Sequence, residues 1–149
     1  MKNKVKYKKL EFLCGTGTMI NMKNNKVTFK GLELTDHTYT RRYDGTKYIY
    51  EVTNLIQYAK EQGYKAFDLP LAGIDMSSLM WHILNMRDMA YHIDRVNKAD
   101  FKHPILIDNQ GCICDGWHRV MKAIMLGHTT IKAIRLLDMP FASSTEDIE

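Results

Sequence analysis

The sequence predicts an α+β fold for this chain of 149 residues, and three observations favour it. Short stretches alternate apolar with polar residues, as half-buried strands do, and two segments repeat apolar residues at helical spacing. Hydrophobic residues make up 45% of the chain and charged residues 26%, which supports a folded core and excludes wholesale disorder. No apolar run reaches the roughly 18–20 residues that a membrane-spanning helix needs.

The first half of the chain predicts strands and one helix. Asp44-Gly45 separates two alternating stretches, and this pair tolerates the positive φ angles of a tight hairpin turn. In chain order we expect a strand around Val27 and Phe29 with a bulge at Gly31, hairpin strands at 39–43 and 46–52, and a helix from an N-cap at Thr53 to Gly63.

The second half predicts the order strand, helix, hairpin, helix, strand. Asn85 is expected to cap the first of these helices, whose apolar residues recur at helical spacing. The methionines at 76, 80, 86 and 89 are expected to pack into a core. The expected elements are a strand at 66–71, a helix after Asn85, strands at 104–107 and 112–114 around a turn at 108–111, a helix at 119–126 and a strand at 130–136.

These elements suggest three regions and an uneven distribution of charge. We expect a β-rich N-terminal extension at 1–60 packed on a core at 61–138, followed by an acidic tail at 139–149. Residues 1–30 hold eight lysines and one acid, against a net charge of +4 for the whole chain. Such a basic arm either attracts nucleic acid or acidic partners, or is simply a solvated terminus.

Composition also predicts the compartment. The first six residues carry three lysines and lack the apolar stretch of a signal peptide. The chain has only three cysteines, too few for a disulfide framework. Cys112 and Cys114 are expected on one face of a strand as small buried residues rather than as metal ligands. We therefore expect a soluble cytoplasmic protein with reduced thiols and no membrane partner.

The segment that indicates chemistry is Asp115-Gly116-Trp117-His118-Arg119, where a strand gives way to a helix. Glycine allows a sharp turn, and the first amides of a helix favour anions. Arg119 offers a planar donor fork that suits phosphate, and His118 can donate a hydrogen bond or carry a proton. Asp115 adds an acid suited to magnesium. The alternative interpretation is a structural corner in which Asp115 caps the helix and Arg119 pairs at the surface.

Residues 66–136 resemble the ParB/sulfiredoxin-like superfamily. The Asp-Gly-x-His-Arg form of the motif is most similar to its free serine kinase branch. Sulfiredoxins carry their reactive cysteine where this chain has Trp117, which argues against sulfiredoxin chemistry. Only about thirteen residues follow Leu136, too few for the helix-turn-helix domain of the partition clamps. The matching pieces are Leu69-Pro70, Ile74-Asp75, His103 to Ile107, the Asn109-Gln110-Gly111 turn, Asp115 to Arg119, Val120 through Ala123, and Gly127.

The resemblance implies a fold, a site and an activity. The fold is a mixed sheet with helices, and the activity is an Mg²⁺-dependent phosphotransferase or nucleotide hydrolase acting on ATP or CTP. Asp115 would hold Mg²⁺ near the transferred phosphate, and Asp75 is the candidate for a second catalytic acid. The nucleotide phosphates would be bound by Gly116, Trp117, His118 and Arg119, with His118 also catalytic.

Two functions from other classes remain open. The hairpin from Tyr39 to Tyr50 interleaves aromatic rings with Arg41, Arg42 and Lys47. Such a surface can stack bases and hold phosphates, so a nucleic-acid-binding protein or nuclease is one alternative. Cross-strand aromatic pairs in an ordinary hairpin have the same pattern. A catalytically silent protein that binds another protein is the second alternative.

Overall fold

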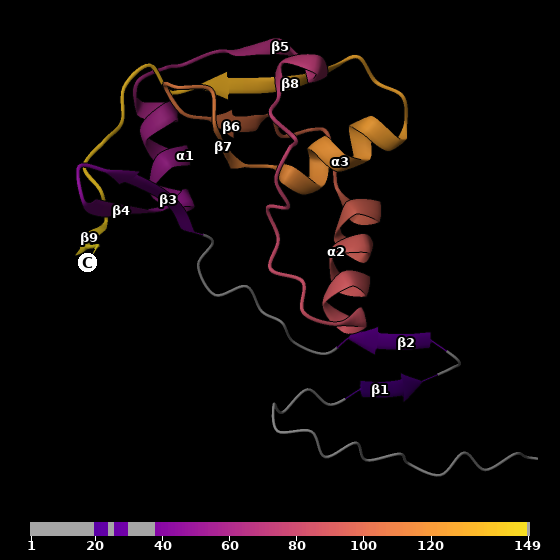
Figure 1. Ribbon diagram of the computed structural model, residues 1–149. Coiled ribbons are helices and arrows are strands. Elements are labelled where there is room, and N and C mark those ends of the chain that lie inside the picture. The colour runs from indigo at the N-terminus through magenta and orange to yellow at the C-terminus, as the bar shows by residue number, and fades with distance from the viewer. Residues whose placement is uncertain (1–19, 24–25, 30–37, 149) are drawn as a thin grey trace, which may run out of the picture. The chain divides into compact units, whose positions relative to one another are not determined.

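The computed structural model describes residues 20–23, 26–29 and 38–148 (Figure 1). The chain divides into two units, Met1–Glu33 and Leu34–Glu149. In the first unit, β1 (Ile20–Lys23) and β2 (Lys26–Phe29) pair as an antiparallel hairpin. The strand predicted around Val27 and Phe29 is therefore confirmed, whereas the bulge expected at Gly31 lies outside the described residues.

The second unit combines helices with two sheets, which confirms the α+β class. The predicted order strand, helix, hairpin, helix, strand is observed from β5 to β8. Its elements are β3 (Thr38–Tyr43), β4 (Thr46–Glu51), α1 (Val52–Glu61), β5 (Ala66–Pro70), the 3-10 helix η1 (Leu71–Gly73), α2 (Met86–Lys98), β6 (Ile105–Ile107), β7 (Ile113–Asp115), α3 (Trp117–Met125), β8 (Thr130–Arg135) and β9 (Ser144–Asp147).

The smaller sheet of this unit is antiparallel, in the order β3-β4-β9. Asp44 and Gly45 form the predicted two-residue turn with φ angles of 49° and 70°, as a primed hairpin turn requires. β9 pairs with β4 over Thr46 to Ile49. The segment 139–149, expected as an acidic tail, therefore contains a strand, because the free edge of β4 offers backbone groups that β9 can pair with.

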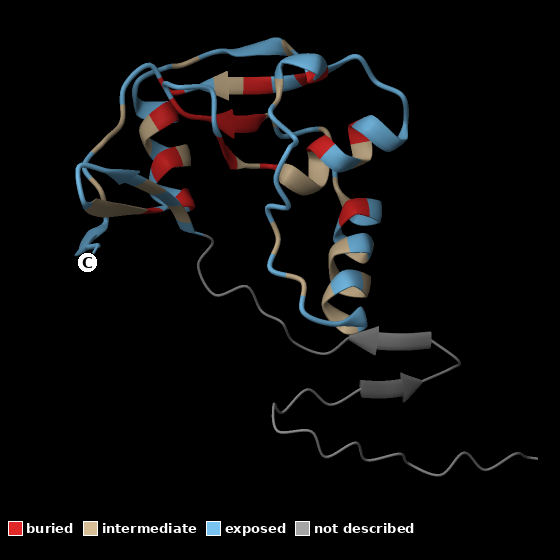
Figure 2. Cartoon of the chain, in the orientation of Figure 1, coloured by how far each residue is buried: buried red, intermediate tan, exposed pale blue. Residues whose placement is uncertain are grey.

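The larger sheet is mixed, in the order β5-β8-β6-β7, and only the β6–β8 pair is parallel. All three residues of β6 are buried, as expected for a strand covered on both faces (Figure 2). Ile105 and Ile107 belong to one core cluster with Val120 of α3. Leu106, pointing to the opposite face, joins a second cluster with Leu55 of α1.

The second cluster links the end of the expected N-terminal extension to the mixed sheet. Tyr50 of β4 and Ala59 of α1 pack in it together with Leu106, Cys114 and Leu136. Residues 38–60, part of the extension expected at 1–60, therefore share a hydrophobic core with the sheet that positions the candidate site.

The N-terminal caps predicted for α1 and α2 have different outcomes in the structure. Asn85 caps α2 as predicted, since its side-chain oxygen accepts a hydrogen bond of 3.0 Å from the backbone N–H of Asp88. Thr53 is wrong as the cap of α1, which starts at Val52 with Glu51 in the N-cap position and no side-chain cap. β4 runs directly into α1, so burial of Val52 sets this boundary.

Candidate functional site

The turn between β7 and α3 is built around a glycine in a left-handed conformation. Asp115 ends β7, Gly116 has a φ of 114°, and α3 starts at Trp117 rather than at the predicted Arg119. A Cβ at Gly116 would lie 2.5 Å from Cγ2 of Ile105 and 2.8 Å from its Cβ. Glycine is therefore required twice, by the backbone angle and by the contact with β6.

Arg119 turns back onto this corner. Its Nη1 donates hydrogen bonds to the carbonyl oxygens of His103 (2.6 Å) and Pro104 (2.7 Å). Its Nη2 donates to the carboxylate of Asp115, and the side chains of Arg119 and Asp115 are 14% and 27% exposed. The guanidinium thus ties α3 to the segment before β6 and to the end of β7. A phosphate contact by Arg119 would require it to exchange these partners.

His118 lies in the first turn of α3 and meets a second histidine. Its Nε2 is 2.9 Å from Nδ1 of His92 in α2. The indole of Trp81 stacks on both imidazoles, with ring centroids 4.6 Å apart in each case. Burial lowers the pKa of His92, and the positive charge of Arg95 lowers it further. The site therefore contains a pair of coupled imidazoles on an aromatic support.

The sequence motif pointed to His118 but gave no signal for His92 or Trp81. These residues come from α3, α2 and the loop before α2. The two histidines are 26 positions apart, and no local pattern indicates that they pair.

The second acid implied by the resemblance, Asp75, lies in an exposed loop after η1. It accepts a hydrogen bond of 2.9 Å from the backbone N–H of Ser77, and this bond lowers the pKa of Asp75. Among the contacts described, Asp75 is engaged within its own loop, while Asp115 is engaged by Arg119.

The residues at the turn do not fit a resident metal ion. The carboxylate of Asp115 already accepts from the guanidinium of Arg119, whose positive charge opposes a cation there. Within the described part of the chain, no three His, Cys, Asp or Glu residues are grouped so that they could hold a metal. Mg²⁺ at Asp115 therefore stays an expectation of the resemblance.

A small apolar groove of about 90 Å³ lies beside the start of α3. Trp117 and Trp81 line it together with Met76, Leu79 and Met121. The Nε1 of Trp117 is buried without a hydrogen-bond partner among the described atoms. The four methionines at 76, 80, 86 and 89, expected in a core, are instead between 42% and 76% exposed. Helical spacing indicated an apolar face, and in this structure much of that face is open to solvent.

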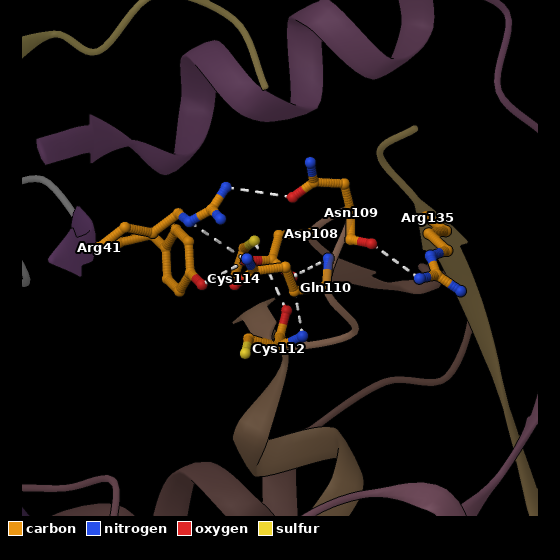
Figure 3. Close-up of polar contacts among 8 residues, drawn as sticks. Arg41, Asp108, Asn109, Gln110, Cys112, Cys114 and Arg135 are labelled. Carbon is orange, nitrogen blue, oxygen red and sulfur yellow. Dashed lines mark hydrogen bonds and ion pairs between the residues drawn. The ribbon is translucent and has the colours of Figure 1, made fainter. Parts of the chain in front are cut away.

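The turn between β6 and β7 holds a fully buried carboxylate (Figure 3). Oδ2 of Asp108 accepts a 2.8 Å hydrogen bond from the hydroxyl of Tyr39 and lies 3.7 Å from Nε of Arg41. Oδ1 accepts from the backbone N–H groups of Gln110 (2.9 Å) and Cys112 (2.8 Å). Asp108 thus links β3 to the mixed sheet through Tyr39 and Arg41.

The hairpin from Tyr39 to Tyr50, for which a nucleic-acid surface was one of two open interpretations, turns several of its aromatic and basic side chains inward. Tyr39 and Arg41 contact Asp108, and Tyr50 is buried, whereas Arg42 and Tyr43 are exposed. Most of the lysine-rich segment at 1–30 lies outside the described residues. The structural evidence from the hairpin therefore favours packing over stacking on bases.

The two cysteines of the β6–β7 hairpin differ in their surroundings. Cys114 lies in β7 and is buried, and burial together with the charge of Asp108 raises the pKa of its thiol. Cys112 precedes the strand and is exposed. The expectation of two small buried residues on one face is thus right for Cys114 and wrong for Cys112, because β7 begins only at Ile113 and Cys112 lies before the strand.

Within the described residues, no helix combines the length and the apolar character required to cross a lipid bilayer. Comparisons of the chain with protein-family models, with curated proteins and with solved structures found no match.

Proposed function

We propose that residues 66–136 form a ParB/sulfiredoxin-like domain that binds a nucleoside triphosphate, ATP or CTP, at the start of α3. The observation that carries the proposal is the corner at Gly116, which packs on β6 and leads directly into a helix with His118 in its first turn. The order β5, α2, β6–β7, α3, β8 supports it, because the motif lies in the strand–turn–strand–helix context of the resemblance.

The chemistry of this corner suits a phosphate group. The N-terminal amides of a helix and its dipole favour anions. The positive φ angle of Gly116 turns the chain from β7 into α3 and so determines the direction of these amides. His118 supplies an imidazole that can donate a hydrogen bond to phosphate or accept a proton. Asp115 and Arg119 act as positioning residues, because their ion pair fixes the corner from both sides.

The proposed reaction is phosphoryl transfer to water or to an acceptor hydroxyl. The bond between the terminal phosphorus and its bridging oxygen breaks while the acceptor oxygen bonds to phosphorus, and the nucleoside diphosphate leaves. Nδ1–H of His118 donates a hydrogen bond to the phosphate, and the proton that the acceptor loses passes to solvent. Asp75 remains an expectation of the resemblance and has no role in this step.

Calorimetric titration of the full chain with ATP and CTP, each with Mg²⁺ in the buffer, tests binding. Loss of a charge-assisted hydrogen bond in His118→Ala is expected to weaken binding by roughly tenfold to a hundredfold. His128→Ala is the matched control, because His128 is an exposed histidine beyond α3. No binding of either nucleotide to folded protein would refute the proposal.

Turnover is tested separately by phosphate release. Asp115→Asn is expected to abolish turnover while sparing much of the binding, provided that circular dichroism shows a folded chain. Arg119→Lys is the companion variant, because lysine keeps the charge but loses the fork that holds two carbonyl groups and a carboxylate. If both variants turn over nucleotide at the wild-type rate, the corner is not part of a catalytic site.

One observation favours a second candidate function, a protein that binds another protein. Met76, Leu79 and Met121 line one groove and are 43%, 71% and 40% exposed, and large apolar residues exposed together often mark interaction surfaces. This function would be favoured over nucleotide chemistry by two results together: the protein binds no nucleotide, and the Leu79→Lys variant no longer forms a one-to-one complex that the wild-type protein forms with a purified partner.

A further inference from the structure

The contact between His92 and His118 has the geometry of a proton-sharing pair. Nδ1 of His92 and Nε2 of His118 are 2.9 Å apart, the rings are only 13° from parallel, and their centroids are 5.2 Å apart. These values correspond to two nearly coplanar rings joined end to end. A hydrogen bond of this kind needs one protonated and one unprotonated nitrogen. The tautomer of each ring therefore depends on that of the other.

This geometry favours a proton over a metal ion between the rings. Two histidine ligands of a tetrahedral zinc ion direct their lone pairs at a third point, about 2.0–2.1 Å from each nitrogen. Here the nitrogens face each other directly at hydrogen-bond distance. No third metal-ligating side chain joins them within the described part of the chain.

Trp81 holds both rings in one plane. Its indole is stacked 6° from parallel with His92 and 14° from parallel with His118. Tyr91 contacts His92 edge-on, with ring centroids 5.3 Å apart. Histidine rings rotate broadly about their last side-chain torsion unless packing restrains them. The aromatic contacts restrain this rotation, and the indole face also favours a positive charge on the pair.

Charged groups surround the pair from two sides. On α2, Asp88 and Arg95 act on His92 with opposite signs, and burial disfavours its charged form. Asp115, at the end of β7, and Arg119, in α3, form an ion pair between residues that flank His118 in the chain. One shared proton is compatible with this environment, whereas a second proton would place two positive charges on adjacent rings.

We propose that His92 is a positioning residue for His118: its hydrogen bond fixes the ring plane and the tautomer of His118, so that His118 acts on the nucleotide phosphate through Nδ1. The inference rests on the proposed function for the phosphate, but the pairing itself does not. Because Nε2 of His118 faces His92, any ligand contact of His118 has to involve the other ring nitrogen.

Two substitutions at position 92 separate the hydrogen bond from the stacking. His92→Phe keeps an aromatic ring against Trp81 but removes Nδ1. His92→Asn keeps a side-chain amide close to the position of Nδ1 but removes the ring. His82→Phe is the matched control, because His82 is an exposed histidine in the loop that carries Trp81.

The first readout is the ¹⁵N NMR spectrum of the imidazoles in the full-length protein without nucleotide. We expect a single tautomer for His118 and a scalar coupling between His92 Nδ1 and His118 Nε2. In His92→Phe the coupling disappears and His118 becomes a mixture of tautomers, whereas His92→Asn restores one tautomer and His82→Phe changes nothing. An unchanged His118 spectrum in folded His92→Phe would overturn the proposal. If His92→Phe does not fold, a mixture of tautomers for His118 in wild type, with no coupling to His92, would overturn it.

The second readout is nucleotide turnover as a function of pH. In His92→Phe we expect kcat to fall by roughly tenfold or more, with KM nearly unchanged and the pH profile shifted. Turnover that requires His118 but is unaffected by His92→Phe would refute the inference and leave the proposed function intact. If His118 has a single tautomer but the protein turns over no nucleotide, the hydrogen bond between His92 and His118 would be supported and the proposed function refuted.

Discussion

Replacement of Gly116 by alanine is the sharpest test of the corner that opens α3. The new Cβ would lie 2.5 Å from Cγ2 and 2.8 Å from Cβ of Ile105, distances at which atoms overlap. Ile105 is fully buried in the central part of the mixed sheet, and β-branched side chains have little rotational freedom. The contact therefore cannot be relieved without moving β6 or the start of α3.

The expected loss of stability has two parts. A non-glycine residue in a left-handed conformation costs about 1–2 kcal/mol, and overpacking a well-filled core costs about 1–3 kcal/mol. We expect Gly116→Ala to lower the free energy of unfolding by about 2–5 kcal/mol, a large share of the stability of a small domain.

Gly127→Ala is the matched control for this substitution. Gly127 also has a positive φ, of 74°, but nothing lies within 4 Å of the position of its added Cβ. This variant should lose only the conformational part, about 1–2 kcal/mol. Equilibrium unfolding in urea, followed by tryptophan fluorescence and by circular dichroism, measures both values. Equal losses for the two variants would refute the steric reasoning.

Four further predictions concern other parts of the structure. Asp108→Asn should lower the free energy of unfolding in urea by about 2–3 kcal/mol, because the buried carboxylate accepts from a hydroxyl and two backbone N–H groups; an unchanged midpoint would contradict this. Burial and the hydrogen bond to Asp108 raise the pKa of Tyr39, so its contribution to stability is complete below about pH 10 and falls at higher pH. Thermal melts should therefore show a smaller alkaline loss for Tyr39→Phe than for wild type. Arg119→Lys should lower the free energy of unfolding by about 2–3 kcal/mol, because lysine has no planar fork that can donate to three protein oxygens at once. If this variant loses nucleotide affinity but no stability, Arg119 contacts phosphate instead. Iodoacetamide followed by peptide mass spectrometry should label the exposed Cys112 and leave the buried Cys114 unmodified, and equal labelling of folded protein would contradict the burial.

Local signals predicted the local structure well. The pair Asp44-Gly45 indicated its hairpin because these two residues adopt positive φ at low cost, and Asn85 indicated the start of α2 because its side chain can cap a backbone N–H. Gly116 likewise indicated a sharp turn before α3. Thr53 predicted the wrong start for α1. The helix begins one residue earlier, at the buried Val52, because β4 joins α1 directly.

The sequence by itself determined the α+β class, the order of elements from β5 to β8 and the glycine corner, because each depends on residues close together in the chain. Only the tertiary structure decided which groups meet. It turned Arg119 onto His103 and Pro104, paired His92 with His118 on Trp81, and brought Tyr39 to Asp108, 69 positions away. Hydrophobic spacing indicates that a face is apolar, but not whether another element covers it, as the exposed Met86 and Met89 of α2 show. These side-chain contacts form only when the helices pack on the two faces of the mixed sheet. They therefore depend on the packing of the whole domain and not on neighbouring residues in the chain.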